Sequence, residues 1–332
     1  MALLNFGVSE ALSEKVARWA QEGLEIIVDK PERLGYEFKL RPWPYFILAW
    51  IIGFWAALKI VVYRLATRKN LQELRFVIPR LNFWFDYSDQ LKAIRKGAAS
   101  WRALDILYNY FSKYQGVNGL RSRESDFWIG GAYNSQAIRN RLKLAKDELK
   151  KAIRRFINEP EIRIFSIASG SAQEVVESLQ ELNGEAKLNF KVVLLDVDQT
   201  AIDDSKALVE NAGMLDKFVF LKANTRAVEE VMAKFQPHIV EMVGFLDYRP
   251  RDKAIALVAR IRKLLPQGGI FLTCNIRNNP ERPLVDYCLM WRMIYRNPKK
   301  FAEIIIEAGY NPCCVRIVYE PFKIHGLAVC QA

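Results

Sequence analysis

The sequence is poor in the residues that bind metals and form disulfide bonds. It has two histidines, His238 and His325, and five cysteines. The number of cysteines is odd, and no two of them form a Cys-x-x-Cys pair. Such a set argues against a zinc centre and against a fold held together by disulfide bonds. We therefore expect no bound metal, and thiols that are mostly buried in a reducing compartment.

Other absences concern targeting and repetition. The first residues lack the basic start and compact apolar run of a cleavable secretory signal, so we expect none. No internal repeat or low-complexity tract is visible. An apolar fraction of 51% in 332 residues predicts a chain with a substantial core, folded as one large domain or two ordinary ones.

The net charge of +12 belongs almost entirely to the first half of the chain. Residues 1–160 hold 27 Lys and Arg against 16 Asp and Glu, whereas residues 161–332 hold 22 against 21. This asymmetry indicates either an anionic partner for the first half, nucleic acid or an anionic membrane surface, or a set of solvated helix faces. The hydrophobic segment described next favours the membrane surface.

Pro42 to Leu58 is a run of 17 residues without a charge, and the apolar character continues beyond it. At about 1.5 Å per residue, roughly 20 helical residues match a hydrocarbon core of about 30 Å. Interspersed Trp and Tyr, with Arg64, Arg68 and Lys69 at one end, are typical of headgroup contacts. We expect a membrane-associated helix over 42–69, spanning the bilayer or lying in one leaflet. A long buried helix in a soluble domain is the alternative.

The rest of the first half is predicted to be helical. Residues 9–28 form an amphipathic pattern with Ser9 as a plausible cap and Leu12 on its apolar face, and a charged connector follows to residue 41. Residues 70–157 end in a strongly basic helix over 135–157. The expected parts are therefore 1–41, 42–69, 70–157 and a C-terminal domain over 158–332.

From Glu161 onward, β-branched apolar runs alternate with helical patterns, which predicts parallel βαβ units. The last two strands are only a few residues apart and should pair antiparallel. The predicted fold class is α/β, a doubly wound, mostly parallel seven-stranded sheet with an antiparallel terminal hairpin, preceded by a helical N-terminal region with one hydrophobic helix. The expected strands are 162–168, 191–197, 218–223, 238–246, 270–276, 313–319 and 326–330.

A small-residue turn, Ala168-Ser169-Gly170-Ser171, follows the first strand of this pattern. Ligands of doubly wound sheets bind at the carboxyl ends of the strands, beside the first strand. Small residues let the backbone approach a ligand closely, and the N–H groups of the next helix attract a carboxylate. Asp196 ends the second strand, 26 residues after Gly170. At that spacing an acid can accept the hydroxyls of a ribose.

The stretches FSIASGSAQE, LLDVDQTAID, LLPQGGIFLTCN and EAGY together resemble the class I S-adenosylmethionine-dependent methyltransferases. VGFLDYRPRD and DYCLMWRMIYRNPKKF are similar to a bacterial branch of these enzymes. The chain departs from the usual glycine-rich pattern, because only Gly170 remains of the glycines. The acid usual in the first strand is replaced by Ser166 or Ala168.

The resemblance implies S-adenosyl-L-methionine as cofactor. The turn around Gly170 would hold the methionine part and Asp196 the ribose. The segment Glu241 to Tyr248, which leaves the fourth strand and includes Val243, would face the methyl group. Residues after the second and third strands would border the adenine, namely Val197, Asp198, Ala223 and Asn224. The family often has an acid near Asn224, so an amide there departs from its pattern.

Methyl transfer is an in-line displacement, and a base is needed only where the acceptor must lose a proton. Candidates for that role are Asp247, Tyr248, Tyr295 and His325, each with a structural role as the alternative. We expect the acceptor between residues 244–248 and an amphipathic insertion over 286–296, partly roofed by helices of the first half. The expected substrate contacts are Trp291, Arg292 and Arg296. Alternatively, Trp291 and Tyr295 lie four residues apart on one helix face that packs onto the sheet.

The interpretation that unites these features is methyl transfer to a lipid or other hydrophobic small molecule at an anionic membrane surface, with the methyltransferase domain in the cytoplasm. The alternatives are a soluble small-molecule methyltransferase and a non-catalytic assembly protein that keeps the fold. Nucleic acid is not the expected acceptor, because no RNA-binding module and no Asn-Pro-Pro-Tyr motif is present.

Overall fold

The computed structural model describes residues 14–78, 88–116, 122–185 and 188–332. The chain divides into two compact units. The sheet unit comprises residues 1–36, 141–277 and 294–332, and the helical unit comprises residues 37–140 and 278–293. Each unit therefore takes segments from distant parts of the sequence. Ser9 and Leu12, expected in the first helix, lie outside the described residues.

The sheet has the order β1-β7-β8-β6-β5-β2-β3-β4. Neighbouring strands are parallel except β8, which is antiparallel to both β6 and β7. This arrangement confirms the predicted doubly wound sheet with its antiparallel terminal hairpin. The strands are β1 (Glu25–Val28), β2 (Ile162–Ile167), β3 (Phe190–Asp196), β4 (Phe218–Lys222), β5 (Ile239–Met242), β6 (Ile270–Ile276), β7 (Val315–Tyr319) and β8 (His325–Gln331).

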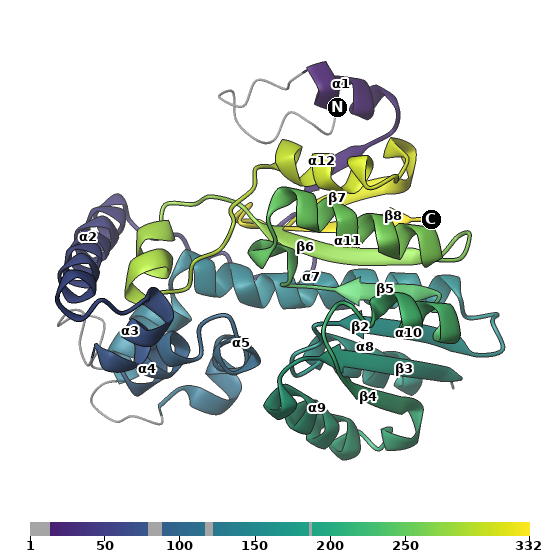
Figure 1. Ribbon diagram of the computed structural model, residues 1–332, viewed down its shortest axis with the longest axis horizontal. Coiled ribbons are helices and arrows are strands. Elements are labelled where there is room, and N and C mark those ends of the chain that lie inside the picture. The colour runs from purple at the N-terminus through teal and green to yellow at the C-terminus, as the bar shows by residue number, and fades with distance from the viewer. Residues whose placement is uncertain (1–13, 79–87, 117–121, 186–187) are drawn as a thin grey trace. The chain divides into compact units, whose positions relative to one another are not determined.

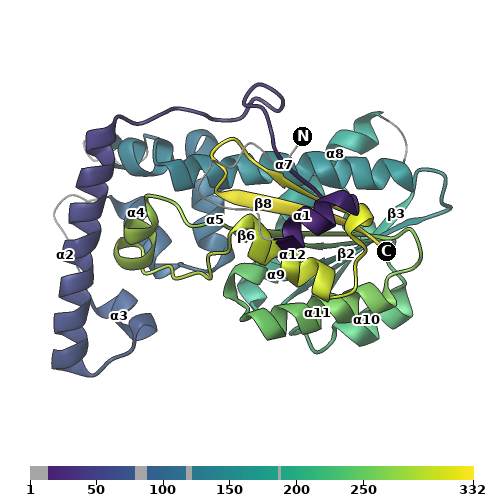
Figure 2. The same cartoon turned by 90° about the horizontal axis from the view of Figure 1, so that it is seen from above.

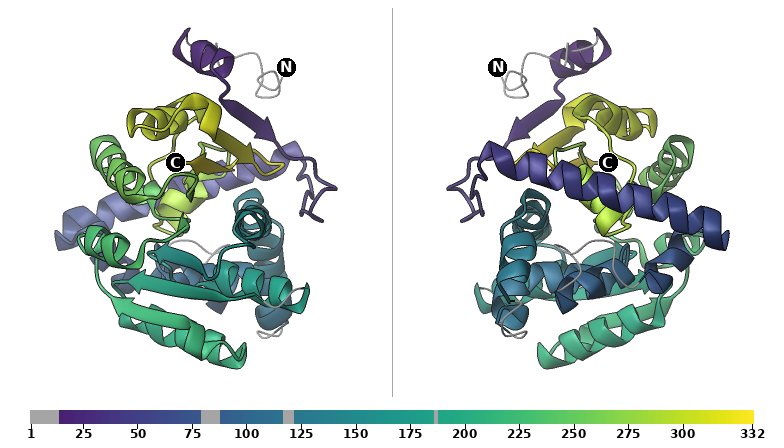
Figure 3. Two further views of the ribbon diagram at one scale, coloured as in Figure 1. Left: turned by 90° about the vertical axis from the view of Figure 1, so that its right-hand side faces the viewer. Right: turned by 90° about the vertical axis from the view of Figure 1, so that its left-hand side faces the viewer.

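The sheet has one strand more than predicted, and the helix expected over 9–28 does not extend to residue 28. Helix α1 covers Glu14–Gln21, and β1 then pairs parallel to β7 at the edge of the sheet (Figure 3). Gly23 lies between them at a φ of +103°, and a Cβ there would come within 2.9 Å of the Cα of Cys313. The β-branched run after this turn pairs with the backbone N–H and C=O groups at the edge of β7. This long-range pairing overrides the local helical pattern.

Helices cover both faces of the sheet, which is why the strands read as continuous apolar runs. Neighbouring residues such as Ile164 and Phe165 point to opposite faces and are both fully buried. On one face lie α7 (Tyr133–Arg155), α8 (Gln173–Glu185) and α9 (Gln199–Asn211). On the other lie α1, α10 (Val228–Phe235), α11 (Arg251–Leu264) and α12 (Pro298–Glu307) (Figure 2).

The helical unit is built around the predicted hydrophobic helix, α2 (Trp43–Thr67). A late segment, the π-helix η7 (Leu284–Cys288), returns to pack along α2 (Figure 1). Gly53 allows the approach, since a Cβ there would lie 2.6 Å from the Cβ of Pro283. The other helices among the described residues of the unit are α3 (Leu71–Val77), α4 (Asp89–Lys96), α5 (Trp101–Tyr108), η2 (Tyr110–Tyr114), α6 (Ser122–Ser125) and η4 (Asp126–Gly130).

A second part of the returning segment caps the long helix α7. The buried Glu281 carboxylate accepts the backbone N–H groups of Tyr133 at 2.7 Å and Asn134 at 2.8 Å, and the hydroxyl of Tyr45 at 2.6 Å. A carboxylate at this end satisfies unpaired N–H groups and complements the helix dipole. Glu281 therefore joins α2 and the start of α7 within the helical unit.

The basic residues of α7 are largely used in ion pairs. In the helical unit, Arg139 forms a two-pronged pair with Glu37, at 2.6 and 2.7 Å. In the sheet unit, Lys146 pairs with Glu177 at 2.5 Å and Glu181 at 2.6 Å. Several basic residues of α7 thus fix neighbouring segments, while Lys151, Arg154 and Arg155 near its end are exposed.

Candidate active site

The turn after β2 has a left-handed backbone at three positions. Ala168, Gly170 and Ala172 have φ values of 55°, 55° and 54°. A left-handed alanine costs about 1–2 kcal/mol, which is why such turns usually carry glycine. The chain keeps the shape of a glycine-rich turn with alanine at two of these positions. Counting glycines in the sequence therefore underestimates how well this turn is formed.

Asp196 and the turn are joined directly. Its Oδ2 accepts the N–H of Gly170 at 2.9 Å, and its Oδ1 accepts the N–H of Asp198 at 2.9 Å. Each carboxylate oxygen retains accepting capacity for a further donor. The turn and the acid singled out from the sequence thus meet at the carboxyl ends of β2 and β3.

The other residues assigned to the adenine lie around Asp196. Val197 is 63% exposed, and Asp198 caps α9 by accepting the N–H of Thr200 at 2.9 Å. The N–H of Ala223 donates to the Asp196 carbonyl at 2.9 Å, which brings the end of β4 beside the acid. Asn224 is exposed, and its side chain accepts the N–H of Arg226.

Ser169 provides a test of whether these residues fit the implied cofactor. Its hydroxyl is buried and has no hydrogen-bond partner in the part of the chain that the structure describes. An orphan polar atom beside an anion-attracting turn is what a polar ligand would satisfy. With Asp196 as ribose acceptor, the residues present fit S-adenosylmethionine.

A buried pair of carboxyl groups lies next to the turn. Glu241 on β5 accepts the Ser166 hydroxyl of β2 at 2.5 Å and the N–H of Val243 at 2.6 Å. Glu174, in the first turn of α8, shares a hydrogen bond with Glu241. Burial, reinforced by the charge of Glu174, raises the pKa of Glu241 to about 8. One carboxyl of the pair therefore carries a proton near neutral pH.

The acid missing from the first strand is thus supplied by a neighbouring strand. Ser166 stands at the expected position and holds the Glu241 carboxylate there. Sequence reasoning named Glu241 only as the start of the segment facing the methyl group, and it gave no site role to Glu174 or to the buried Arg141 of α7. The available signal was a charged residue inside an otherwise apolar strand, as in IVEM.

Asp247, predicted as a catalytic base, is buried in the loop that follows β5. Its Oδ1 accepts the N–H of Ile276 at 2.7 Å, which ties this loop to the end of β6. Burial raises the pKa of Asp247 to about 6. Tyr248, in the same short 3-10 turn, is partly buried.

Arg296, predicted to contact substrate, is buried and donates to groups of the protein. Its guanidinium contacts the carbonyl of Leu246 at 2.9 Å, the side chain of Asn275 at 2.5 Å and the carbonyl of Arg249. These bonds fix the loop after β5 and the end of β6, because they satisfy carbonyls that the irregular backbone leaves open.

The segment 286–296 is divided rather than forming one helical insertion. Trp291 and Arg292 belong to the helical unit, whereas Tyr295 and Arg296 belong to the sheet unit. The expectation that Trp291 and Tyr295 share a helix face is wrong, because residues 290–297 are irregular. The left-handed backbone at Met290, with a φ of 51°, ends η7, and α12 begins only at Pro298.

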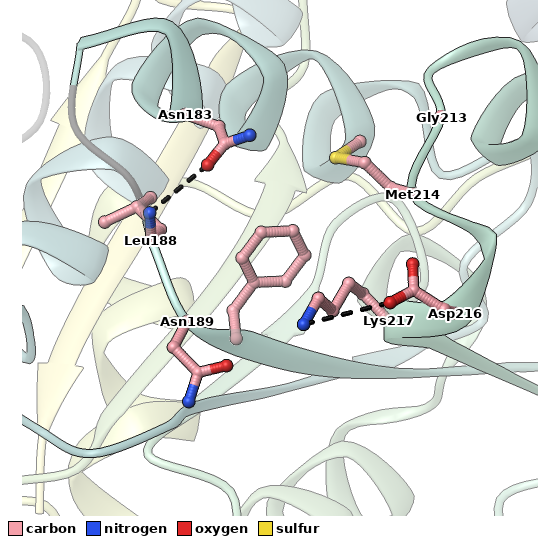
Figure 4. Close-up of a pocket in the computed structure, with 8 residues that line it drawn as sticks. Asn183, Leu188, Asn189, Gly213, Met214, Asp216 and Lys217 are labelled. Atoms are coloured by element: carbon pink, nitrogen blue, oxygen red, sulfur yellow. Dashed lines mark hydrogen bonds and ion pairs between the residues drawn. The ribbon is translucent and has the colours of Figure 1, made fainter.

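A cavity of about 460 Å³ lies elsewhere on the sheet unit (Figure 4). It is lined among others by Asn189, Met214 and Lys217, which stand at the amino ends of β3 and β4. Ligands of parallel sheets bind at the carboxyl ends. This cavity is therefore at the wrong end of the strands for the chemistry predicted here.

The strand order and the joined turn and acid define a class I S-adenosylmethionine-dependent methyltransferase domain. Residues 63–331 match the model of the family described as "Putative methyltransferase", and the chain belongs to this family. It is thus an S-adenosylmethionine-dependent methyltransferase, as its motifs suggested.

Solved structures resemble the chain at low sequence identity. A "possible exported protein" from Bordetella parapertussis has 14% identity and a TM-score of 0.63, with 88% of this chain and 99% of that one covered. An O-methyltransferase family protein from Burkholderia thailandensis has 13% identity and a TM-score of 0.44, with 60% of each chain covered. The first likeness supports the fold alone. No curated protein matches this sequence.

Proposed function

We propose that the protein transfers a methyl group from S-adenosylmethionine to a lipid or another hydrophobic small molecule at a membrane surface. The observation that carries the membrane part is the uncovered apolar face of α2. Single exposed apolar residues are ordinary, whereas a continuous apolar face indicates a partner or a membrane. Its members are 37–78% exposed: Trp43, Ile47, Leu48, Trp50, Ile51, Phe54, Trp55, Leu58, Val61, Val62 and Leu65.

The opposite face of α2 argues for a helix lying in the plane of the membrane. Ala49, Gly53 and Ala56 are buried against the helical unit. In the part of the chain that is described, α2 is the one helix long and apolar enough to span a bilayer, and 33% of its most apolar window is buried. A spanning helix would draw its packing partner η7 into hydrocarbon, together with the ion pair of Arg282 and Asp286. An in-plane helix immerses only its open face.

Basic residues at the end of α2 lie next to its exposed apolar face, where they can contact an anionic membrane surface. Arg64, Arg68 and Lys69 at the end of α2 are exposed. Each basic residue near an anionic surface contributes about 1 kcal/mol of attraction. The apolar face and these cations together favour attachment to an anionic membrane.

Within the sheet unit, we propose that the turn around Gly170 binds the methionine part of the cofactor and Asp196 its ribose. Val197, Asp198 and Ala223 border the adenine. The cofactor supplies an electrophilic methyl group on a sulfonium. The protonated pair of Glu174 and Glu241 offers the ammonium end a carboxylate, because ionising the pair becomes favourable beside a cation.

The acceptor assignments remain predictions. Tyr248 and Tyr295 are proposed as proton acceptors, and Asp247, already bonded to Ile276, contributes by positioning the loop. Trp291 and Arg292 are proposed as acceptor contacts. The guanidinium carbon of Arg292 lies 5.6 Å from the ring of Tyr287, which orients it.

The cofactor assignment is tested by calorimetry with S-adenosylhomocysteine. Asp196→Ala should lose affinity by roughly 10- to 150-fold, since charge-assisted hydrogen bonds contribute about 1.5–3 kcal/mol. Asp203→Ala removes an exposed acid from α9 and serves as the matched control. Equal affinities of wild type and Asp196→Ala would refute the ribose assignment, and no binding by wild type would refute use of the cofactor.

Membrane attachment is tested by flotation of the full chain with vesicles of phosphatidylcholine and phosphatidylglycerol. Phe54→Glu, at a site 68% exposed, should abolish flotation, because burying a Phe contributes about 1.5–3 kcal/mol and a charge reverses the gain. Ile157→Glu, at a site 49% exposed in the sheet unit, is the control. If the wild-type protein does not float with vesicles and elutes as a dimer, the exposed apolar face of α2 instead joins two copies of a soluble enzyme.

A further inference from the structure

His325 is a buried histidine whose two ring nitrogens both lack a hydrogen-bond partner among the described residues. It is the first residue of β8 and pairs with Ile276 at the carboxyl end of β6. Burial and the charge of Arg141 lower the pKa of His325 well below its usual value, so the ring is neutral. A neutral imidazole always carries one N–H donor and one lone pair. Leaving the N–H donor and the lone pair of a buried imidazole unpaired is unfavourable, so their lack of partners points to a ligand.

Arg141 lies on the helix that covers this end of the sheet. One turn further along α7, Leu144 packs with Cys274 of β6 and Leu327 of β8. A Cβ on Gly244, just beyond β5, would lie 3.4 Å from Nη1 of Arg141. The guanidinium therefore sits above the ends of β5, β6 and β8.

Strand alternation places His325 on the same face as Arg141. Side chains two residues apart on a strand share a face. Leu327 packs under α7, and His325 precedes it by two residues. Ser166 and Glu241 share this face with Ile164 and Ile239, which pack under α7 and α8. His325 lies on this same face, level with Ile276 and thus four residues beyond Leu272, the register partner of Glu241, towards the carboxyl end of β6.

The charges near Arg141 favour one kind of ligand. Glu174 and Asp247 lie within its electrostatic reach, while Arg296 also offsets the charge of Asp247. A guanidinium has five N–H donors and can serve more than one partner. Together with an imidazole N–H it forms a donor set that suits a carboxylate or another acidic oxygen, and that repels an amine.

We propose that the methyl acceptor carries a carboxyl or acidic hydroxyl group, and that Arg141 and His325 bind this group as its anion. The inference rests on the proposed methyl transfer and names the class of its substrate. No bond to Arg141 or His325 is made or broken, so both are binding residues.

The class is tested with methyl-labelled S-adenosylmethionine and a solvent extract of the source cells, divided into three portions. Diazomethane methylates carboxyl and acidic hydroxyl groups in one portion, carbodiimide with methylamine blocks only carboxyl groups in another, and the third is untreated. We expect diazomethane to abolish label transfer. If label transfer is also lost in the carbodiimide-treated portion, the acceptor group is a carboxyl. If label transfer persists in that portion, the acceptor group is an acidic hydroxyl. Transfer that survives diazomethane overturns the proposal. No transfer to the untreated portion refutes the proposed function itself, and the inference falls with it.

The residues are tested by His325→Phe and Arg141→Met. Both should bind S-adenosylhomocysteine within about twofold of wild type while label transfer falls roughly 10- to 100-fold, the range for a lost charge-assisted hydrogen bond. His325→Gln, which restores an N–H donor, should recover part of the label transfer that His325→Phe loses. His238→Gln, at the other histidine, is the control.

Stability gives a readout independent of activity. His325→Phe removes an unpaired donor and keeps a ring, so its unfolding midpoint should not fall below that of wild type. A lowered midpoint would mean that His325 is structural. A loss of S-adenosylhomocysteine affinity in Arg141→Met would assign Arg141 to the cofactor. Either result overturns the proposal.

Discussion

Glu241 links a single side chain to the pH dependence of stability. Both of its oxygens accept hydrogen bonds, yet burial beside Glu174 raises its pKa from 4.5 to about 8. Between these values the folded protein binds more protons than the unfolded chain. Stability therefore decreases as pH rises through this window. Asp247, whose pKa is raised from 3.8 to about 6, acts in the same direction at lower pH.

Glu241→Gln should flatten this dependence between pH 6 and 8, because the glutamine cannot ionise. We expect the variant to gain about 1–3 kcal/mol over wild type at pH 8, an order of magnitude set by about 1.4 kcal/mol per unit of pKa shift. The decline between pH 4 and 6, due to Asp247, should remain. Urea unfolding across pH measures both. Glu230→Gln on α10, at an exposed acid, is the control. If the stability of Glu241→Gln falls between pH 6 and 8 as steeply as that of wild type, ionisation of buried Glu241 does not cause the decline.

At the level of elements, the contact of α2 with η7 depends on a missing side chain. A Cβ at Gly53 would come within 2.6 Å of the Cβ of Pro283 and 3.0 Å of its carbonyl carbon, so backbone would have to move. Gly184, on α8, is also helical but has nothing within 4 Å of its Cβ position. Replacing each glycine with alanine therefore distinguishes the effect of packing, at Gly53, from the effect of helix propensity, at Gly184.

Gly53→Ala should destabilise the helical unit by about 1–3 kcal/mol, the usual effect of overpacking. Gly184→Ala should stabilise the sheet unit by up to about 1 kcal/mol, since alanine is the better helix former. Denaturant unfolding of both variants gives the comparison. A neutral Gly53→Ala would show that α2 and η7 separate without loss of stability.

For the whole molecule, the tryptophans are unevenly shared between the two units. Of eight in the sequence, Trp19 alone falls within the residue ranges of the sheet unit. Tryptophan fluorescence therefore reports mainly on the helical unit, whereas far-ultraviolet circular dichroism reports on both. Each unit has its own core, and such units commonly unfold as separate transitions.

Saturating S-adenosylhomocysteine should therefore raise the midpoint of the circular dichroism transition that has no counterpart in fluorescence, and leave the fluorescence midpoint nearly unchanged. A ligand at 100 times its dissociation constant adds about 2.7 kcal/mol to the unit that binds it. Thermal scans with both probes, with and without ligand, measure the effect. Equal shifts in the two signals would show that the units unfold together, coupled through α7, which runs from one into the other.

Several features of this protein follow from local sequence. Apolar runs buried on both faces predict parallel strands, because each run needs only its own residues to be recognised. Two final strands a few residues apart could pair in one way only. Gly170 and Asp196 end consecutive strands, and the carboxyl ends of parallel strands meet at one edge. These features gave the fold class correctly, and they predicted that the turn at Gly170 and Asp196 meet at one edge of the sheet.

Features that depend on partners far along the chain were decided only by the tertiary structure. β1 forms because β7 offers an open edge nearly 300 residues later. Glu241 replaces the missing acid because its strand lies beside Ser166. Arg141 is one basic residue among several in its helix, and only the packing of α7 on β6 and β8 places it near His325. Sequence periodicity records which residues are buried, whereas the identity of each buried neighbour depends on how distant elements pack together.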